Sequence, residues 1–279
     1  MIEEYEIGGF IMDKKEKYSL QDLCSIMETL RGPEGCPWDC EQSHDTLKGY
    51  LIEETYEVIE AINLKDDKMI CEELGDVLLQ VVFHSSIAKG KGTFDIDDVI
   101  KGISEKMILR HPHVFGDVKA DTSEEVLKNW DEIKKKEKGT ETQSDVMKKI
   151  PKELPALLRS YKVQQKAAKV GFDWDNTDDV IAKIEEELCE VKMAIKNNDA
   201  NNIKEELGDL LFAVVNLSRF IDANPELSLD SANEKFIRRF EFVENNVKEQ
   251  GMDLMEMTLA QMDEIWNMAK KEEREDEIR

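Results

Sequence analysis

One acidic signature occurs twice in this chain with the same internal spacing. Each copy reads Glu-Glu-x-x-Glu and is followed, at a fixed distance, by Glu-x-x-Asp. The first copy comprises Glu53, Glu54, Glu57, Glu73 and Asp76, and the second comprises Glu186, Glu187, Glu190, Glu206 and Asp209. Corresponding acids are 133 residues apart (187 − 54 = 133). A spacing repeated this closely indicates one site built twice.

The spacing of these acids predicts a metal site. Two acids three residues apart lie on one face of a helix, and a short turn between two such helices aims four carboxylates at one point. Negative charge concentrated in this way is unfavourable unless a cation lies at its centre. Hard divalent cations take oxygen ligands of this type. The expected ion is Mg²⁺, with Mn²⁺ as an alternative.

Chance must be weighed, because the chain has 62 Asp and Glu among 279 residues. An isolated Glu-x-x-Asp pair is usually part of a solvated helix face. These acids, however, lie within the apolar stripes of their helices: Glu54, for example, is one helical turn from Leu51 and Val58. An unpaired carboxylate is costly there, so the repeated set favours a ligand site.

The composition limits the partners of the chain. A net charge of −24 and a pI near 4.6 disfavour nucleic acid and anionic membrane surfaces, since both require a basic face. A small polyanion can still bind if metal ions and a few placed basic residues receive it. Five cysteines without Cys-x-x-Cys spacing indicate reduced thiols. With no apolar run long enough to span a membrane and no signal peptide pattern, a cytoplasmic protein is expected.

Apolar residues at helical spacing fill the segments between the Gly and Pro residues, so the expected class is all-α. Helices are predicted near residues 19–31, 44–63, 67–89, 95–110, 123–138, 154–169, 177–197, 199–222, 228–249 and 258–275. The expected domains are 18–138 and 152–279, with 139–151 as a linker. The four Trp support a duplication, because Trp38 pairs with Trp174 and Trp130 with Trp266 at one common offset.

Three further residues could contact a phosphorylated ligand. Lys235 and Arg239 are four residues apart, so they lie on one helix face and could grip successive phosphates. Trp266 lies between apolar residues of the last predicted helix. Core packing is its default role, and stacking on a nucleobase is the alternative. The sequence leaves these two readings of Trp266 open.

Several motifs together resemble the MazG family, the tandem all-α nucleoside triphosphate pyrophosphohydrolases. The similarity extends from about residue 20 to residue 271. Besides both acidic signatures, it includes RGxxGCPWD at residues 31–39, RHPHVFGD at 110–117 and VGFDW at 170–174.

The resemblance implies a Mg²⁺-dependent homodimer that cleaves nucleoside triphosphates between the α and β phosphates. It implies that the second repeat is the main catalyst, with four metal ligands, Glu187, Glu190, Glu206 and Asp209. Lys235 and Arg239 then contact phosphate and Trp266 the base. The corresponding acids of the first repeat are intact, namely Glu54, Glu57, Glu73 and Asp76. The chain departs from the family at Asn202, where a Lys is sometimes found.

A mechanism from the residues alone agrees with this resemblance. Metal ions held by four carboxylates can neutralise a triphosphate and lower the pKa of a bound water that attacks phosphorus. Glu186, next to the ligands, could position that water, although adjacent helix positions point about 100° apart. The competing reading is a non-catalytic acidic scaffold that binds nucleotide or regulates a partner. Intact carboxylates in both repeats argue against it.

Overall fold

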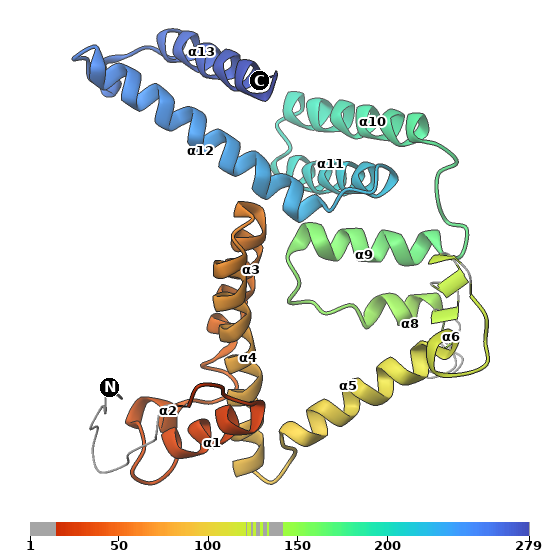
Figure 1. Ribbon diagram of the computed structural model, residues 1–279. Helices are drawn as coiled ribbons and strands as arrows, with labels where there is room; N and C mark the ends of the chain where they lie inside the picture. The colour runs from red at the N-terminus through yellow and green to blue at the C-terminus, as the bar shows by residue number, and fades with distance from the viewer. Residues whose placement is uncertain are drawn as a thin grey trace. The chain divides into compact units, whose positions relative to one another are not determined.

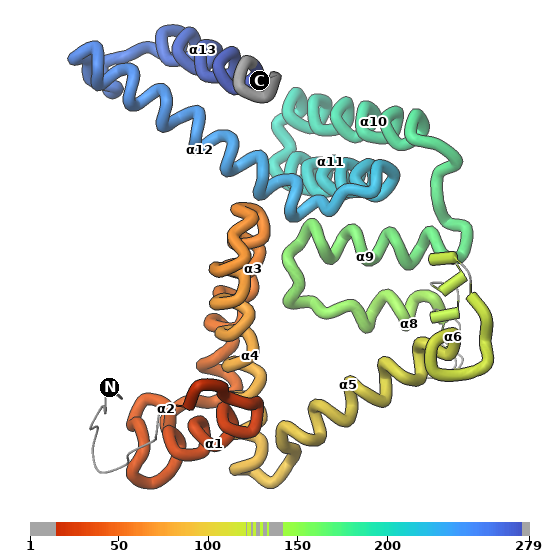
Figure 2. The backbone as a smooth tube through the Cα atoms, viewed as in Figure 1, coloured from red at the N-terminus to blue at the C-terminus, as the bar shows by residue number. Residues whose placement is uncertain are grey.

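The computed structural model describes residues 15–120 and 142–278, together with residues 122, 123, 125, 126, 129, 130 and 133. All regular elements in this part of the chain are helices (Figures 1 and 2). The expected all-α class is therefore confirmed. The chain divides into two compact units, residues 1–134 and 135–279.

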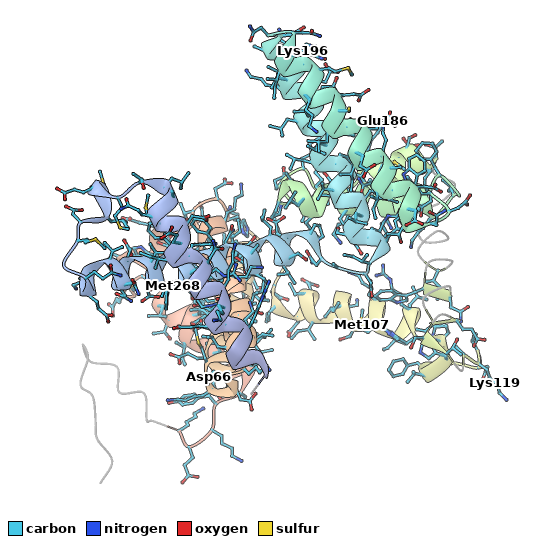
Figure 3. All side chains as sticks on the ribbon, turned by 90° about the horizontal axis from the view of Figure 1, so that it is seen from above. Asp66, Met107, Lys119, Glu186, Lys196 and Met268 are labelled. Carbon is cyan, nitrogen blue, oxygen red and sulfur yellow. The ribbon has the colours of Figure 1, made fainter. Side chains whose placement is uncertain are left out.

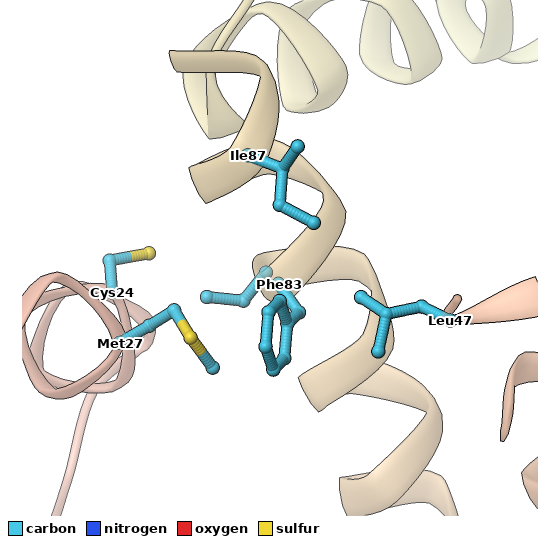
Figure 4. Packing of buried hydrophobic residues seen from close by; sticks show 6 residues of the cluster. Cys24, Met27, Leu47, Phe83 and Ile87 are labelled. Carbon is cyan, nitrogen blue, oxygen red and sulfur yellow. The ribbon is translucent and has the colours of Figure 1, made fainter. Parts of the chain in front are cut away.

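The first unit is built around a helical hairpin. Its helices are α1 (Leu20–Leu30), α2 (Pro37–Glu41), α3 (Lys48–Leu64), α4 (Asp67–Gly90), α5 (Ile96–Arg110) and α6 (Pro112–Phe115). Helices α3 and α4 form the hairpin, and α1 packs against α4. The buried core between them comprises Cys24, Met27, Leu47, Val82, Phe83 and Ile87 (Figure 4).

The second unit repeats the hairpin and adds a long helical pair. Its elements are α8 (Gln143–Lys148), α9 (Ala156–Ala168), α10 (Thr177–Lys196), α11 (Ala200–Phe220), α12 (Pro225–Glu249), a 3₁₀ turn (Leu254–Glu256) and α13 (Leu259–Ile278). Helices α10 and α11 form the hairpin, and α9 packs against α11. Helices α12 and α13 enclose a smaller core of Val243, Val247 and Ile265.

The two hairpins turn at equivalent residues. One residue of each turn is left-handed, with φ of 56° at Lys65 and at Asn198. The next residue caps the second helix in both: the side chains of Asp66 and Asp199 accept hydrogen bonds from backbone N–H groups of the first turn. Both pairs are separated by the offset of the acidic signatures. Residues of the hairpins can therefore be compared position by position.

The observed helices differ from the predicted ones mainly at short elements. Helices α2, α6 and α8 were not expected, since segments of four to six residues have no readable period. Helix α12 begins at Pro225, three residues before the predicted start, because Asn224 caps it and proline suits the first helical position. The helix predicted over 123–138 falls largely outside the described residues.

Helix α8 lies within the segment 139–151 that was expected to be a linker. The domain limits 18–138 and 152–279 stay a prediction. No helix in the described part of the chain is long and apolar enough to cross a membrane.

Candidate metal centre

The second hairpin brings three acids of its signature together. Carboxylate oxygens of Glu187, Glu190 and Glu206 all lie within 4.8 Å of one another. The first two come from α10 and the third from α11, as the helix periodicity predicts. Burial raises the pKa of Glu190, and the charges of Glu206 and Glu187 raise it further. The three carboxylates repel one another, and a cation between them would relieve that repulsion.

Glu187 is the most enclosed of these acids, with 6% of its surface exposed. Its Oε1 lies 2.8 Å from the Nζ of Lys183, but its Oε2 is buried without a hydrogen-bond partner. A buried, unpartnered carboxylate oxygen is unfavourable, and a divalent cation satisfies it. The cluster therefore fits a hard cation with oxygen ligands.

Lys183 joins Glu187 to the preceding acid. Its Nζ also lies 2.8 Å from Oε1 of Glu186. The hydrogen bonds with Glu186 and Glu187 raise the pKa of Lys183. Glu186 projects from the exposed side of α10 (Figure 3) and is not among the clustered carboxylates. Sequence reasoning did not identify Lys183, although its position four residues before Glu187 is a pairing signal.

The first hairpin assembles the corresponding acids. Carboxylate oxygens of Glu54, Glu57 and Glu73 lie within 4.8 Å of one another. Burial is the largest cause of a raised pKa at Glu54, followed by the charges of Asp76 and Glu57. Burial and Glu57 likewise raise the pKa of Glu73. One difference is that Gln80 donates from its Nε2 to Glu54 Oε1 at 3.5 Å, whereas Ala213 occupies the equivalent position of α11.

The three-residue groups do not include the fourth acid of either signature, although both of these acids lie near them. Asp76 is close enough to influence the pKa of Glu54 and Glu73. Asp209 lines a cavity together with Glu187. The assignment of Asp76 and Asp209 as metal ligands stays a prediction.

A cavity of about 590 Å³ adjoins the second cluster. Glu187, Asp209 and Lys183 line it. The other lining residues are mostly apolar and come from α8, α9 and α11 and from the loop that precedes α10. They include Val163, Ala167, Phe172, Trp174, Phe212 and Ala213. Sequence reasoning missed this cavity, although VGFDW in the loop was a signal.

An ion pair fixes that loop to α11. Arg219 donates from Nη1 to Asp173 Oδ2 at 2.8 Å and from Nη2 to the other carboxylate oxygen. The same guanidinium donates to Oδ1 of Asn216, from Nε at 3.2 Å and from Nη2 at 3.0 Å. All three residues line the cavity. The loop and the helix face are thereby held in one arrangement.

The predicted substrate contacts form a separate group. Arg239 pairs with Glu273, with 2.8 Å between Nε and Oε2, and its guanidinium lies 5.8 Å from the centre of the Trp266 ring. The Trp266 ring also lies 5.0 Å from that of Phe236. Lys235 is exposed. Among the described residues, the polar and aromatic contacts of Arg239 and Trp266 lie within α12 and α13 and involve none of the clustered carboxylates. Their roles, and that of Lys235, stay predictions.

The chain is similar to one family throughout both hairpins. The MazG nucleotide pyrophosphohydrolase domain matches residues 42–115 and again residues 175–248. These two segments contain both acidic clusters.

Curated relatives match nearly the whole chain. The "nucleoside triphosphate pyrophosphohydrolase/pyrophosphatase MazG" of Thermotoga maritima is 49% identical over 90% of this chain and 95% of its own length. The "nucleoside triphosphate pyrophosphohydrolase" of Escherichia coli K12 is 44% identical over 90% of this chain and 97% of its own length. The uncharacterized protein YabN of Bacillus subtilis is 51% identical over 94% of this chain and 54% of its own length.

Proposed function

The chain belongs to the MazG nucleotide pyrophosphohydrolase family, and we propose that its second repeat cleaves nucleoside triphosphates between the α and β phosphates. The products are a nucleoside monophosphate and pyrophosphate. The observation that carries this proposal is the cluster of Glu187, Glu190 and Glu206 beside a cavity within a MazG domain. The fold class and the family are those that the sequence predicted.

Glu187, Glu190 and Glu206 would hold the metal, with Asp209 as a fourth ligand. The unpartnered Oε2 of Glu187 supports this assignment. A bound Mg²⁺ or Mn²⁺ supplies charge neutralisation and an acidified water. Within the chain, Lys183 keeps the Glu187 carboxylate in place through its 2.8 Å contact. Glu186 is held by the same Lys183 and could orient the attacking water at the edge of the site.

Lys235 and Arg239 are proposed to bind phosphates. Arg239 is balanced by Glu273 within the chain, so a phosphate would have to compete for the guanidinium. The guanidinium group of Arg239 can form bidentate hydrogen bonds with a phosphate, whereas the ammonium group of Lys235 acts as a point charge. Lys235 and Arg239 do not contact the clustered carboxylates in the described part of the chain. Their contribution to substrate binding is therefore best tested separately from that of the proposed metal ligands.

We propose that the active form is a homodimer. Both hairpins expose two Leu at equivalent positions: Leu74 and Leu78 in α4, and Leu207 and Leu211 in α11. Each of these side chains is about half exposed, and a spacing of four places each pair on one helix face. Such apolar stripes suit burial against another helix. Light scattering that gives a monomer with full activity would contradict the dimer.

The alternative of a non-catalytic scaffold is disfavoured by the intact clusters in both repeats. The five cysteines are free thiols, which supports a reducing, cytoplasmic location.

The function is tested by mixing the purified chain with single nucleoside triphosphates and measuring pyrophosphate, with Mg²⁺ or with a chelator. We expect pyrophosphate and monophosphate with Mg²⁺ and neither product with the chelator. The same screen over canonical and modified nucleotides identifies the preferred substrate. Orthophosphate as the first product would contradict the proposal.

A further inference from the structure

Two histidines of the first unit face each other outside its acidic cluster. The Nδ1 of His44 lies 2.8 Å from the Nδ1 of His84. The two rings are nearly parallel, inclined by 10°, and their centres are 5.1 Å apart. Because the ring centres are much further apart than the two nitrogens, the Nδ1 atoms point toward each other. The pair joins the turn before α3 to α4, 40 residues further along the chain.

The contact between the two nitrogens requires one shared proton. In a neutral pair, one Nδ1 carries the proton and donates it to the lone pair of the other. Two imidazole nitrogens that face each other in this way are also placed to hold one metal ion between them. A tetrahedral zinc ion binds imidazole nitrogen at about 2.0–2.1 Å, which separates two such nitrogens by about 3.3 Å. The pair would have to open by only about half an ångström.

From this geometry we infer that His44 and His84 form a binding site for a divalent metal ion of the zinc class, which takes the place of the shared proton. Zn²⁺, Ni²⁺ and Cu²⁺ favour imidazole ligands, whereas Mg²⁺ favours oxygen. The two histidines therefore offer a different chemistry from the acidic clusters of the hairpins. Such an ion is separate from the one proposed to act in catalysis.

The surroundings of His84 keep its imidazole neutral. His84 is partly buried and follows Phe83, which belongs to the buried core of the first unit (Figure 4). Burial lowers the pKa of His84, and the neighbouring His44 lowers it further. A histidine binds metal as the neutral imidazole. The burial that opposes protonation therefore leaves a nitrogen lone pair available to a metal ion.

Asp45, the residue after His44, is positioned to supply a third ligand. Its carboxylate pairs with Lys48 at 2.5 Å, and the Asp45 side chain is 85% exposed. Lys48 is the main cause of the lowered pKa of Asp45, and the charge of His44 contributes, which places this carboxylate near the pair. A turn of the exposed side chain from Lys48 toward the imidazoles would add an oxygen ligand. Zinc accepts Asp as well as His, and water can complete the coordination.

The second repeat shows that the hairpin does not require a histidine at this helix position. Leu217 of α11 stands where His84 stands in α4 (84 + 133 = 217). All four histidines of the chain lie in the first unit. An imidazole loses hydration when it is partly buried, a cost that leucine does not have. Two imidazoles that meet in the first repeat therefore indicate a role other than packing.

An ion held by the pair would cross-link two segments that are distant in sequence. Its ligands converge only in the folded chain, so the ion would stabilise the first unit by mass action. Two or three protein ligands leave the remaining positions to water. The stability of the first unit would then follow the concentration of the free metal ion.

Zinc uptake by the full chain tests the site. Zn²⁺ is titrated by calorimetry in the presence of saturating Mg²⁺, which occupies the oxygen sites. The wild type should bind about one Zn²⁺ per chain more than His84→Leu or His44→Leu. His111→Gln is the matched control and should behave as the wild type, because Nδ1 of His111 already donates to the Met107 carbonyl at 2.6 Å. Equal zinc uptake by all four proteins would overturn the inference.

Two further measurements do not rest on zinc uptake alone. In the wild type, Zn²⁺ should shift the Nδ1 resonances of His44 and His84 in imidazole nitrogen NMR and leave those of His111 and His113 in place. Zn²⁺ should also raise the melting temperature of the wild type more than that of His84→Leu. Circular dichroism checks that the variants are folded. Resonances of His44 and His84 that do not respond to Zn²⁺ would show that the pair is a hydrogen bond only, and the metal site would be ruled out.

Discussion

The Nζ of Lys183 lies 2.8 Å from Oε1 of Glu187, one turn further along α10. This contact places a cation against the most buried acid of the cluster, while the other oxygen of that acid has no partner. The first repeat has Tyr50 at the equivalent position, and Glu54 there is contacted by the neutral Gln80. The two clusters therefore share their acids but differ in the groups that hold them.

Replacing Lys183 with Met should destabilise the metal-free chain. The variant removes the positive charge that balances Glu187 and Glu186, so the carboxylates of the cluster repel one another without compensation. The free energy of unfolding should fall by about 1 kcal/mol, as for other partly exposed ion pairs. Added Mg²⁺ should raise the melting temperature of this variant more than that of the wild type. Lys192→Met, a substitution at an exposed position of the same helix, is the control. It should neither lower the stability of the metal-free chain nor change the effect of Mg²⁺ on the melting temperature. Equal Mg²⁺ effects in all three proteins would contradict this role of Lys183.

The proposed metal ligands of the two repeats should be unequal in catalysis. Glu190→Gln should lower turnover at least about a hundredfold, since metal-assisted charge stabilisation contributes several kcal/mol. The matched change Glu57→Gln should reduce turnover much less. Pyrophosphate release at saturating nucleotide measures both.

Both of these Gln variants should stay folded, because each removes one charge from a repelling cluster. Activity lost in Glu57→Gln and kept in Glu190→Gln would reverse the assignment of the repeats. Equal partial losses would mean that both sites turn over.

The acidic hairpins could be predicted because their geometry is local. A three-residue spacing fixes which carboxylates share a helix face, and capping residues such as Asp66 and Asp199 fix the turn. These rules need no knowledge of distant contacts. The clustering of Glu187, Glu190 and Glu206 followed from them directly.

The cavity could not be predicted in the same way. Its lining residues come from four helices and a loop, so its volume depends on side chains that are distant in sequence, such as Val163 and Phe212. The small side chain of Ala213 leaves space for a cavity only because α9 and the loop lie beside it. The loop ion pair of Asp173 and Arg219 spans a similar separation, beyond the reach of helix-pair rules.

Stability of the first unit should depend on pH through His84. Burial lowers the pKa of His84 from 6.5, and the adjacent His44, whose Nδ1 is 2.8 Å from the Nδ1 of His84, lowers it further. The folded chain thus binds this proton less readily than the unfolded chain. The contribution of neutral His84 is present above pH 6.5 and is lost as the pH falls through the lower folded pKa.

His84→Leu, which installs the residue found at the equivalent position 217, removes this dependence. The difference in unfolding free energy between wild type and variant, measured by urea titration, should shift in favour of the variant as the pH falls below 6.5. A difference that stays constant from pH 8 to 5 would show that His84 does not titrate in this way.

The ion pair between Asp173 and Arg219 should govern substrate affinity through the loop. Arg219 holds the loop carboxylate and also the amide of Asn216, so breaking the pair releases both the aromatic loop and a polar wall of the cavity. Asp173→Asn and Arg219→Gln should each raise KM severalfold while changing kcat little, because neither residue is a metal ligand in this assignment. Since the two residues act as one unit, the KM of the double variant should be close to that of either single variant. The coupling free energy calculated from the four KM values should be about 1 kcal/mol. Steady-state kinetics of the wild type, the two single variants and the double variant give the KM and kcat values for this double-mutant cycle. Additive effects, or a fall in kcat with unchanged KM, would show that the pair does not act by holding the loop.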